Sequence, residues 1–236
     1  MKKYTFRIIA MVLFLIGVIP GMLIFGGASW ADLESVFYGF QDMGGGRLNT
    51  LDCPILMTSS DVGTVEATFK NPNDTPISFM VQADISNSGM FRTERSTVNL
   101  EGKKSKTISW KVTSQDVDLR NFIFVQISNF PAQKIPFRQA TCGIMVLNFP
   151  QFSGNQVFPF AMIVILGGIV GGLWIWELYG QPVSGKLPEM TRAMKTLGIL
   201  VLVGMLVSFW GSWLFGVIIF AASVLAIGVI LGFLLA

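Results

Sequence analysis

The chain has 236 residues, of which 52% are hydrophobic and only 13% are charged. Soluble domains usually carry about 25% charged residues, so this composition predicts a membrane protein. The net charge of +3 would suit an anionic partner, but the basic excess lies beside apolar segments, at Lys2, Lys3, Arg7, Lys186, Arg192 and Lys195. Residues 32–150 hold 11 basic and 12 acidic residues. The charge therefore indicates membrane topology and argues against a nucleic-acid partner.

The amino-terminal segment, residues 1–31, has features of both a membrane anchor and a signal peptide. Two lysines precede an uncharged run from Ile8 to Phe25, and small residues follow at Ser29 and Ala31. The small residues are typical of a signal cleaved after Ala31, but the run exceeds the ~7–15 apolar residues of a signal and approaches the ~20 of a spanning helix. We predict a transmembrane anchor, with a cleaved signal peptide as the alternative; either one exports the residues that follow.

Residues 32–52 form a short segment that precedes the first cysteine. Its three consecutive glycines, residues 44–46, favour a flexible connector. Phe37, Tyr38 and Phe40 follow directly on the apolar segment. Aromatic residues are enriched where a membrane meets water, so they indicate an interfacial belt, with a docking site for a partner as the alternative.

Residues 53–149 alternate apolar and polar side chains with period two, which is typical of half-buried strands. The clearest runs are Val65–Phe69, Ile77–Ile85, Ile108–Val112 and Ile123–Ile127. Turn-forming residues separate them, for example Asn87-Ser88-Gly89 and Glu101-Gly102-Lys103. About seven strands in a hundred residues predict an all-β immunoglobulin-like sandwich.

Cys53 and Cys142 are the only two cysteines, and they flank the strand pattern. In an exported domain such a pair predicts a disulfide, with two buried free thiols as the alternative. Closing a loop of nearly ninety residues would stabilise the domain by roughly 4 kcal/mol in the chain-entropy model.

A strand ends in Asn71-Pro72, with Asp74 and Pro76 close behind, and Leu100, Gly102 and an outgoing strand through Trp110 follow. This pattern resembles bacterial envelope Ig-like modules of the CARDB and fibronectin-like kind. It covers residues 60 to 130 and implies a fold without implying an activity. Trp110 falls late, and the cysteines join the terminal strands, so the pattern departs from antibody domains.

The carboxy-terminal region, residues 150–236, predicts helices at about 157–179, 195–211 and 213–236. The first contains two overlapping small-xxx-small spacings, formed by Gly167, Gly168, Gly171 and Gly172. Such spacings let membrane helices approach closely, so they predict a packing face toward this chain's own helices or another subunit. The alternative is that glycine is simply common in membrane helices. Three or four spanning helices result, with residues 32–156 extracytoplasmic and the basic loop 180–195 cytoplasmic.

The search for chemistry yields no catalytic residue, cofactor site or metal site. Histidine is absent, and with it the commonest general base and metal ligand. Asp116 and Asp118 are two carboxylates, but two without further ligands are more often part of a loop than a calcium site. The best polar cluster is a candidate patch for an anionic ligand, with a solvated strand edge as the alternative. It consists of Lys103, Lys104, Lys106 and Lys111.

These observations predict a non-catalytic accessory or scaffold subunit of a membrane complex, with an extracytoplasmic Ig-like domain that binds protein or an envelope polymer. Its expected partners are membrane lipid, other membrane-protein subunits and an anionic envelope polymer. The alternatives are an auxiliary component of a transporter or channel and, with less support, an enzyme acting at the surface. The transporter reading is disfavoured because no charge lies deep within the predicted spans.

Overall fold

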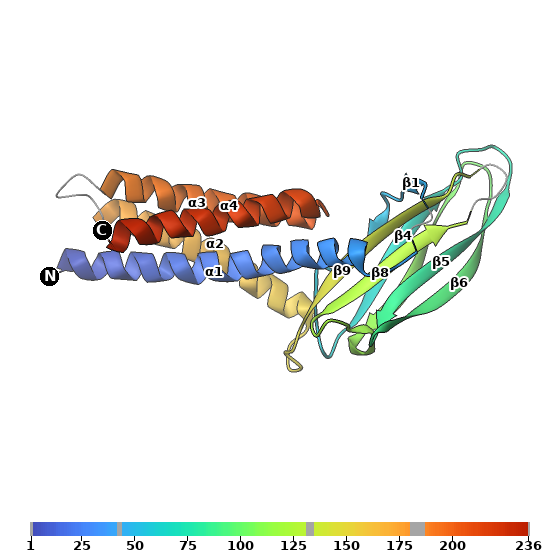
Figure 1. Ribbon diagram of the computed structural model, residues 1–236, viewed down its shortest axis with the longest axis horizontal. Coiled ribbons are helices and arrows are strands. Elements are labelled where there is room, and N and C mark those ends of the chain that lie inside the picture. Colours follow the sequence, from blue (N-terminus) through green and yellow to red (C-terminus); the bar gives the residue numbers. More distant parts are fainter. Residues whose placement is uncertain (1, 42–43, 131–134, 180–186, 236) are drawn as a thin grey trace. The chain divides into compact units, whose positions relative to one another are not determined.

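The computed structural model of the chain describes residues 2–41, 44–130, 135–179 and 187–235 (Figure 1). It divides into two compact units, one built from Met1–Ser29 with Asn155–Ala236 and the other from Trp30–Gly154. The first unit is helical and the second is a β domain. The helix α1 (Lys2–Phe37) contributes its long first part to the helical unit and its last turns to the β domain.

The β domain consists of two sheets. The larger sheet has the order β1-β9-β8-β5-β6, with β3 also paired to β9. Its strands are β1 (Gly46–Arg47), β3 (Leu56–Thr58), β5 (Ile77–Asn87), β6 (Met90–Leu100), β8 (Phe122–Asn129) and β9 (Arg138–Leu147). The smaller sheet has the order β2-β4-β7 and consists of β2 (Leu51–Asp52), β4 (Val62–Lys70) and β7 (Ser105–Thr113). The larger sheet is mixed, because β1 and β3 run parallel to β9 while the other pairs are antiparallel.

The core of the β domain lies between the two sheets, and it is built by the period-two pattern. Alternate residues of a strand point to the same face, so Val81, Ala83 and Ile85 all enter the core from β5 and are fully buried. Ile123 and Ile127 do the same from β8. The sandwich-like layering predicted for residues 53–149 is therefore present in the described part of the chain.

The predicted connector at residues 32–52 is more structured than its composition suggested. The helix α1 continues to Phe37, and residues 46–52 contribute the short strands β1 and β2. Gly143 permits the helical extension to lie against β9, because a Cβ there would meet the carbonyl oxygen of Ala31 at 2.1 Å. The Asp32 carboxylate also accepts a hydrogen bond from the Gly143 N–H at 3.0 Å. Gly45 adopts a φ of +101°, so it serves a specific backbone turn.

The helical unit contains α1, α2 (Gly154–Tyr179), α3 (Leu187–Phe209) and α4 (Trp213–Leu235). Within the described residues, four helical segments are long and apolar enough to cross a membrane: Thr5–Phe37, Gly154–Tyr179, Glu189–Phe209 and Trp213–Gly232. Helix α3 begins eight residues before the predicted start at 195, because a proline near a helix start is tolerated and Glu189 favours the first turn. The predicted loop 180–195 is thus helical from residue 187, and residues 180–186 lie outside the described part.

The interior of the helical unit is apolar. Phe14, Val18 and Phe25 of α1 are buried against Ile169 of α2 and Leu197 of α3 within one cluster. Helices α3 and α4 form a hairpin around Gly211, which has a φ of +68° and lies at the predicted boundary between the last two helices (Figure 1). A hydrogen bond of 2.7 Å joins the buried hydroxyls of Ser29 and Ser208.

Candidate functional site

The cysteines form the predicted disulfide. The Cα atoms of Cys53 and Cys142 are 6.6 Å apart, and 89 residues of sequence separate them. Cys53 directly follows β2 of the smaller sheet, whereas Cys142 lies in β9 of the larger sheet. The bridge therefore fastens the two sheets to each other in addition to closing the long chain loop.

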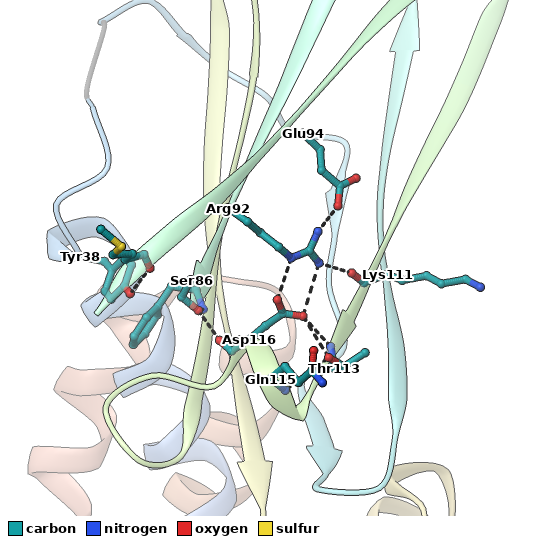
Figure 2. A network of polar contacts seen from close by, with 10 residues as sticks. Tyr38, Ser86, Arg92, Glu94, Lys111, Thr113, Gln115 and Asp116 are labelled. Atoms are coloured by element: carbon teal, nitrogen blue, oxygen red, sulfur yellow. Dashed lines mark hydrogen bonds and ion pairs between the residues drawn. The ribbon is translucent and has the colours of Figure 1, made fainter. Parts of the chain in front are cut away.

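The most extensive polar network of the β domain is centred on Asp116, whose side chain is almost completely buried (Figure 2). The Arg92 guanidinium donates through Nε to Asp116 Oδ1 at 2.7 Å. Its Nη2 donates to the carbonyl oxygen of Lys111 at 2.5 Å. Because Arg92 lies on β6 and Lys111 on β7, this side chain joins the open edges of the two sheets. An ion pair with Glu94 occupies the remaining Nη1.

The backbone around Asp116 completes this network. The sequence Thr113 to Asp116 forms a capping box, in which the Thr113 N–H donates to Asp116 Oδ2 at 2.7 Å. The Ser86 hydroxyl donates to the Asp116 carbonyl oxygen at 2.6 Å and accepts from the Phe124 N–H at 2.9 Å (Figure 2). Both carboxylate oxygens are thus engaged, and the arrangement holds the fold together.

A second polar group lies where α1 ends. The Tyr38 hydroxyl donates to the Asp118 carboxylate, and the carbonyl oxygen of Met90 lies 3.1 Å from the same hydroxyl. The Gly89 N–H also donates to Asp118, at 3.1 Å. Together with Phe91, these residues line an open hollow of about 370 Å³.

The proton shared by this hydrogen bond stays on Tyr38, and Asp118 stays ionised. Burial, and then the neighbouring Asp118 carboxylate, raise the pKa of Tyr38 above its ordinary value. The hydrogen bond from Tyr38 conversely lowers the pKa of Asp118. The pair consists of a neutral phenol and an ionised carboxylate over the ordinary pH range. Neither group has a pKa near neutrality, which efficient general acid or base catalysis favours.

The predicted interfacial aromatics divide between two environments. Tyr38 packs on Phe124 with ring centroids 4.6 Å apart, and Phe40 packs on Phe91 at 5.8 Å. These two rings therefore cover the larger sheet. Phe37, in contrast, is 72% exposed.

The four lysines of the predicted anionic-ligand patch lie in different settings. Lys103 occupies the β6–β7 turn, where its Nζ donates to the carbonyl oxygen of Pro72 at 2.8 Å, and Lys104 lies beside it. Lys106 and Lys111 are both on β7, but their positions differ by five, an odd number, so they lie on opposite faces of the strand. The structure brings Lys103 and Lys104 together and places Lys111 apart from them.

Of the four glycines in the predicted packing face, only two lie in tight contact with another helix. A Cβ on Gly168 would meet the Gly17 backbone nitrogen at 2.6 Å, and one on Gly172 would meet the Phe14 backbone nitrogen at 2.6 Å. Both glycines therefore lie where α2 touches α1 of the same chain. Gly171 would only approach a leucine side-chain methyl at 3.1 Å, and Gly167 has no atom within 4 Å.

Sequence reasoning singled out Asp116 and Asp118 but missed the partners that engage them. The spacing of Thr113 and Asp116 carried a signal, since a threonine followed three residues later by an acid is a capping pattern. No comparable signal links Tyr38 with Asp118, which are 80 residues apart. Among the described residues, no group of three or more metal-ligating side chains gathers in one place.

Comparison with known proteins shows a likeness of fold. The sequence matches no protein-family model and no curated protein. The CARDB domain of a Pyrococcus furiosus protein, solved with di-metal ions, is 15% identical over 42% of this chain and 90% of that chain, with a TM-score of 0.33. A Paenibacillus cycloisomaltooligosaccharide glucanotransferase is 17% identical over 44% of this chain and 14% of that enzyme, with a TM-score of 0.34. A Bacteroides uniformis β-glucuronidase is 11% identical over 41% of this chain and 12% of that enzyme, with a TM-score of 0.32.

A CARDB domain, the kind of module that the sequence resemblance named, is thus among the structures to which this chain is distantly similar. The match with each enzyme spans less than a sixth of that enzyme's length. The metal ions and the sugars named for these structures belong to those proteins.

Proposed function

We propose that this protein is a non-catalytic subunit of a membrane complex, anchored by α1 to α4, whose exported Ig-like sandwich serves as a binding or scaffold module. The observation that carries the proposal is the placement of a disulfide-closed β domain between span-length apolar helices. Disulfides persist in oxidising compartments, which supports export of the domain. Basic residues beside the α2–α3 connection support a cytoplasmic position for that connection.

The internal hydrogen bonds of Asp116 and Asp118 support a binding or scaffold role over an enzymatic one. Asp116 is paired with Arg92 and accepts a hydrogen bond from the Thr113 N–H, and Asp118 accepts from Tyr38 and Gly89. Through these bonds the two carboxylates join strands and connections of the β domain, as expected of a rigid scaffold.

The packing of α1 supports its retention as an anchor. Its residues Phe14, Val18 and Phe25 are buried in the core of the helical unit. Its backbone at Gly17 is also close to Gly168 of α2. Cleavage after Ala31 would remove this whole face and leave apolar surfaces of α2 and α3 without their partner. We therefore favour the anchor over the cleaved signal.

The exposed surfaces of the two units suggest the classes of partner. Val170 and Trp174 of α2 and Leu225 of α4 are more than 60% exposed, which suits contact with lipid or with another subunit's helices. On the β domain, Lys104 and Lys106 are exposed and would suit an anionic envelope polymer. Both assignments are parts of the same proposal.

The test is purification of the tagged full chain in a mild detergent, followed by native mass spectrometry and crosslinking in the original membranes. A subunit should travel with other chains in a fixed ratio, and its crosslinks should map to exposed helix faces or to the sandwich. In a matched control, an unrelated exported sandwich replaces residues 38–149. Partners that bind the helices should still co-purify with this control, whereas partners that bind the sandwich should be lost. A chain that remains alone in both membranes and detergent would contradict the proposal.

A further inference from the structure

One end of the β domain carries nearly all of its exposed large hydrophobic side chains. Outside the last turns of α1, the described residues of the domain expose seven such side chains. Six lie in or beside the connections at one end, which we name the apolar end. They are Val62, Met90, Phe91, Leu119, Phe149 and Phe152. The seventh, Met80, lies elsewhere on β5 and is only 36% exposed.

Hydrogen bonds between the connections show that these six residues share one end. The Ser59 hydroxyl donates to Asn148 at 3.3 Å, which joins the β3–β4 turn to the segment after β9. The Val146 N–H, near the end of β9, donates to the Asn121 carbonyl oxygen at 2.7 Å, which joins the end of β9 to the β7–β8 connection. The bond from Gly89 to Asp118 then joins the β5–β6 turn to the same connection.

The opposite end of the domain has a different character. Its β4–β5 and β6–β7 connections carry Asp74, Glu101, Lys103 and Lys104, and Lys103 pairs with Asp74 at 3.4 Å. No described residue of these two connections is an exposed large hydrophobic. Among the described residues of these connections, the exposed large hydrophobic side chains are therefore confined to one end of the domain.

The β7–β8 connection presents its apolar side chain in an unusual backbone conformation. Leu119 has a φ of +44° and Arg120 a φ of +72°, in the left-handed region that favours glycine. Hydrogen bonds between Asp118 and Phe122 close this connection, at 2.7 and 3.1 Å. The strained turn holds Leu119 54% exposed, with the exposed cation of Arg120 beside it.

We propose that the apolar end is a membrane-contact surface that lies in the interfacial layer of the bilayer. The chain leaves the domain at this end, since α2 begins at Gly154, directly after Phe149 and Phe152. The Gly154 N–H is held by Asp61 of the β3–β4 turn at 2.7 Å, which fixes this exit beside Val62. Aromatic side chains favour the interface, and an arginine beside a leucine can reach lipid phosphate while the leucine enters the acyl boundary.

The occupant is lipid, because the apolar side chains are distributed over four connections around the point where the chain passes into a helix of span length, and aromatic side chains at such a point favour the membrane interface. The inference rests on the proposed membrane anchoring, and it adds that the sandwich touches the bilayer through residues far in sequence from any span. Leu119 is the decisive position, because it lies 35 residues before Gly154.

The experiment uses the full chain with its disulfide intact, reconstituted in vesicles of phosphatidylcholine and phosphatidylglycerol. Single cysteines replace Leu119, Val170 or Ser105 and carry an environment-sensitive NBD fluorophore. Lipids bearing a nitroxide near the headgroup or along the acyl chain then quench any probe that contacts them. Val170 is an exposed position on α2, and Ser105 begins β7 at the opposite end of the domain.

The proposal expects loss of NBD fluorescence at Leu119 with the shallow nitroxide, loss at Val170 with the deep nitroxide, and little loss at Ser105. If Val170 is quenched while Leu119 responds no more than Ser105, the membrane-contact surface is wrong and the anchoring stands. If Val170 is also unquenched, the anchoring itself fails. Self-quenching of NBD at Leu119 without lipid quenching would assign the apolar end to a second copy and overturn the proposal.

Discussion

Adding a single methyl group to Gly168 or to Gly167 should have opposite consequences for the helical unit. The two glycines are neighbours in α2, so the same substitution can be made at two adjacent positions, one exposed and one buried. A Cβ at Gly168 would lie 2.6 Å from the Gly17 nitrogen and 2.8 Å from the Leu13 carbonyl oxygen. A Cβ at Gly167 would meet no atom within 4 Å. The matched pair Gly168→Ala and Gly167→Ala therefore isolates the close approach of α1 and α2.

The expected loss of stability follows from how closely the added Cβ would approach the α1 backbone. Non-bonded carbon atoms are most stable about 3.5–4 Å apart, so Gly168→Ala must displace backbone by roughly 1 Å. Overpacking of this kind typically costs about 1–3 kcal/mol. Gly167→Ala meets no obstacle and gains helix propensity, worth up to about 1 kcal/mol in water. We expect Gly168→Ala to be less stable than Gly167→Ala by at least about 1 kcal/mol.

The assay is unfolding of the full chain in mild detergent, by thermal ramp and by titration with a denaturing detergent. Insertion of both variants in membranes is checked first, so that only folded protein is compared. Equal unfolding midpoints for the two variants would refute the close approach of α1 to α2 at Gly168. The original protein supplies the reference for both.

Three further predictions concern the β domain. Cys142→Ser should lower its stability by roughly 4 kcal/mol in the chain-entropy model and increase its rate of proteolysis, and unchanged resistance would show that the bridge contributes little. Asp116→Ala should cost about 1–3 kcal/mol in thermal unfolding because it leaves Arg92 and the partly buried Thr113 N–H without their partner, whereas Glu94→Ala, at an exposed pair, should cost less than about 1 kcal/mol. The lowered pKa of Asp118 gives stability that is present above its ordinary value of 3.8 and lost as the pH falls through the folded-state value. Asp118→Asn should therefore lose less stability than the original protein when the pH is taken below about 4, and equal losses would contradict this linkage.

The parts of the fold that follow a simple periodicity were predictable from the sequence. Strands such as Ile77–Asn87 alternate over many residues, and this alternation alone determines which side chains enter the core. The disulfide was predictable because only two cysteines exist and they flank the strands. The apolar helices follow from their length and composition.

The remaining features depend on contacts between residues far apart in sequence. The extension of α1 to Phe37 is stabilised by Gly143, more than a hundred residues later, so local composition could not reveal it. Likewise, the sequence shows four similar glycines in α2, but only the direction of α1 distinguishes Gly168 from Gly167. The ion pair of Arg92 with Asp116 required β6 of the larger sheet to lie beside β7 of the smaller sheet, which no local pattern encodes.

The most direct test of the central claim is the sidedness of the β domain and of the α2–α3 connection. Single cysteines at Ser105 and Glu189, both exposed positions, are introduced separately into the chain with its native disulfide closed. On intact cells a membrane-impermeant maleimide should label the Ser105→Cys protein, whereas the Glu189→Cys protein should react only after permeabilisation. Labelling of both positions from outside, or of Ser105→Cys only after permeabilisation, would contradict an exported sandwich anchored by spanning helices.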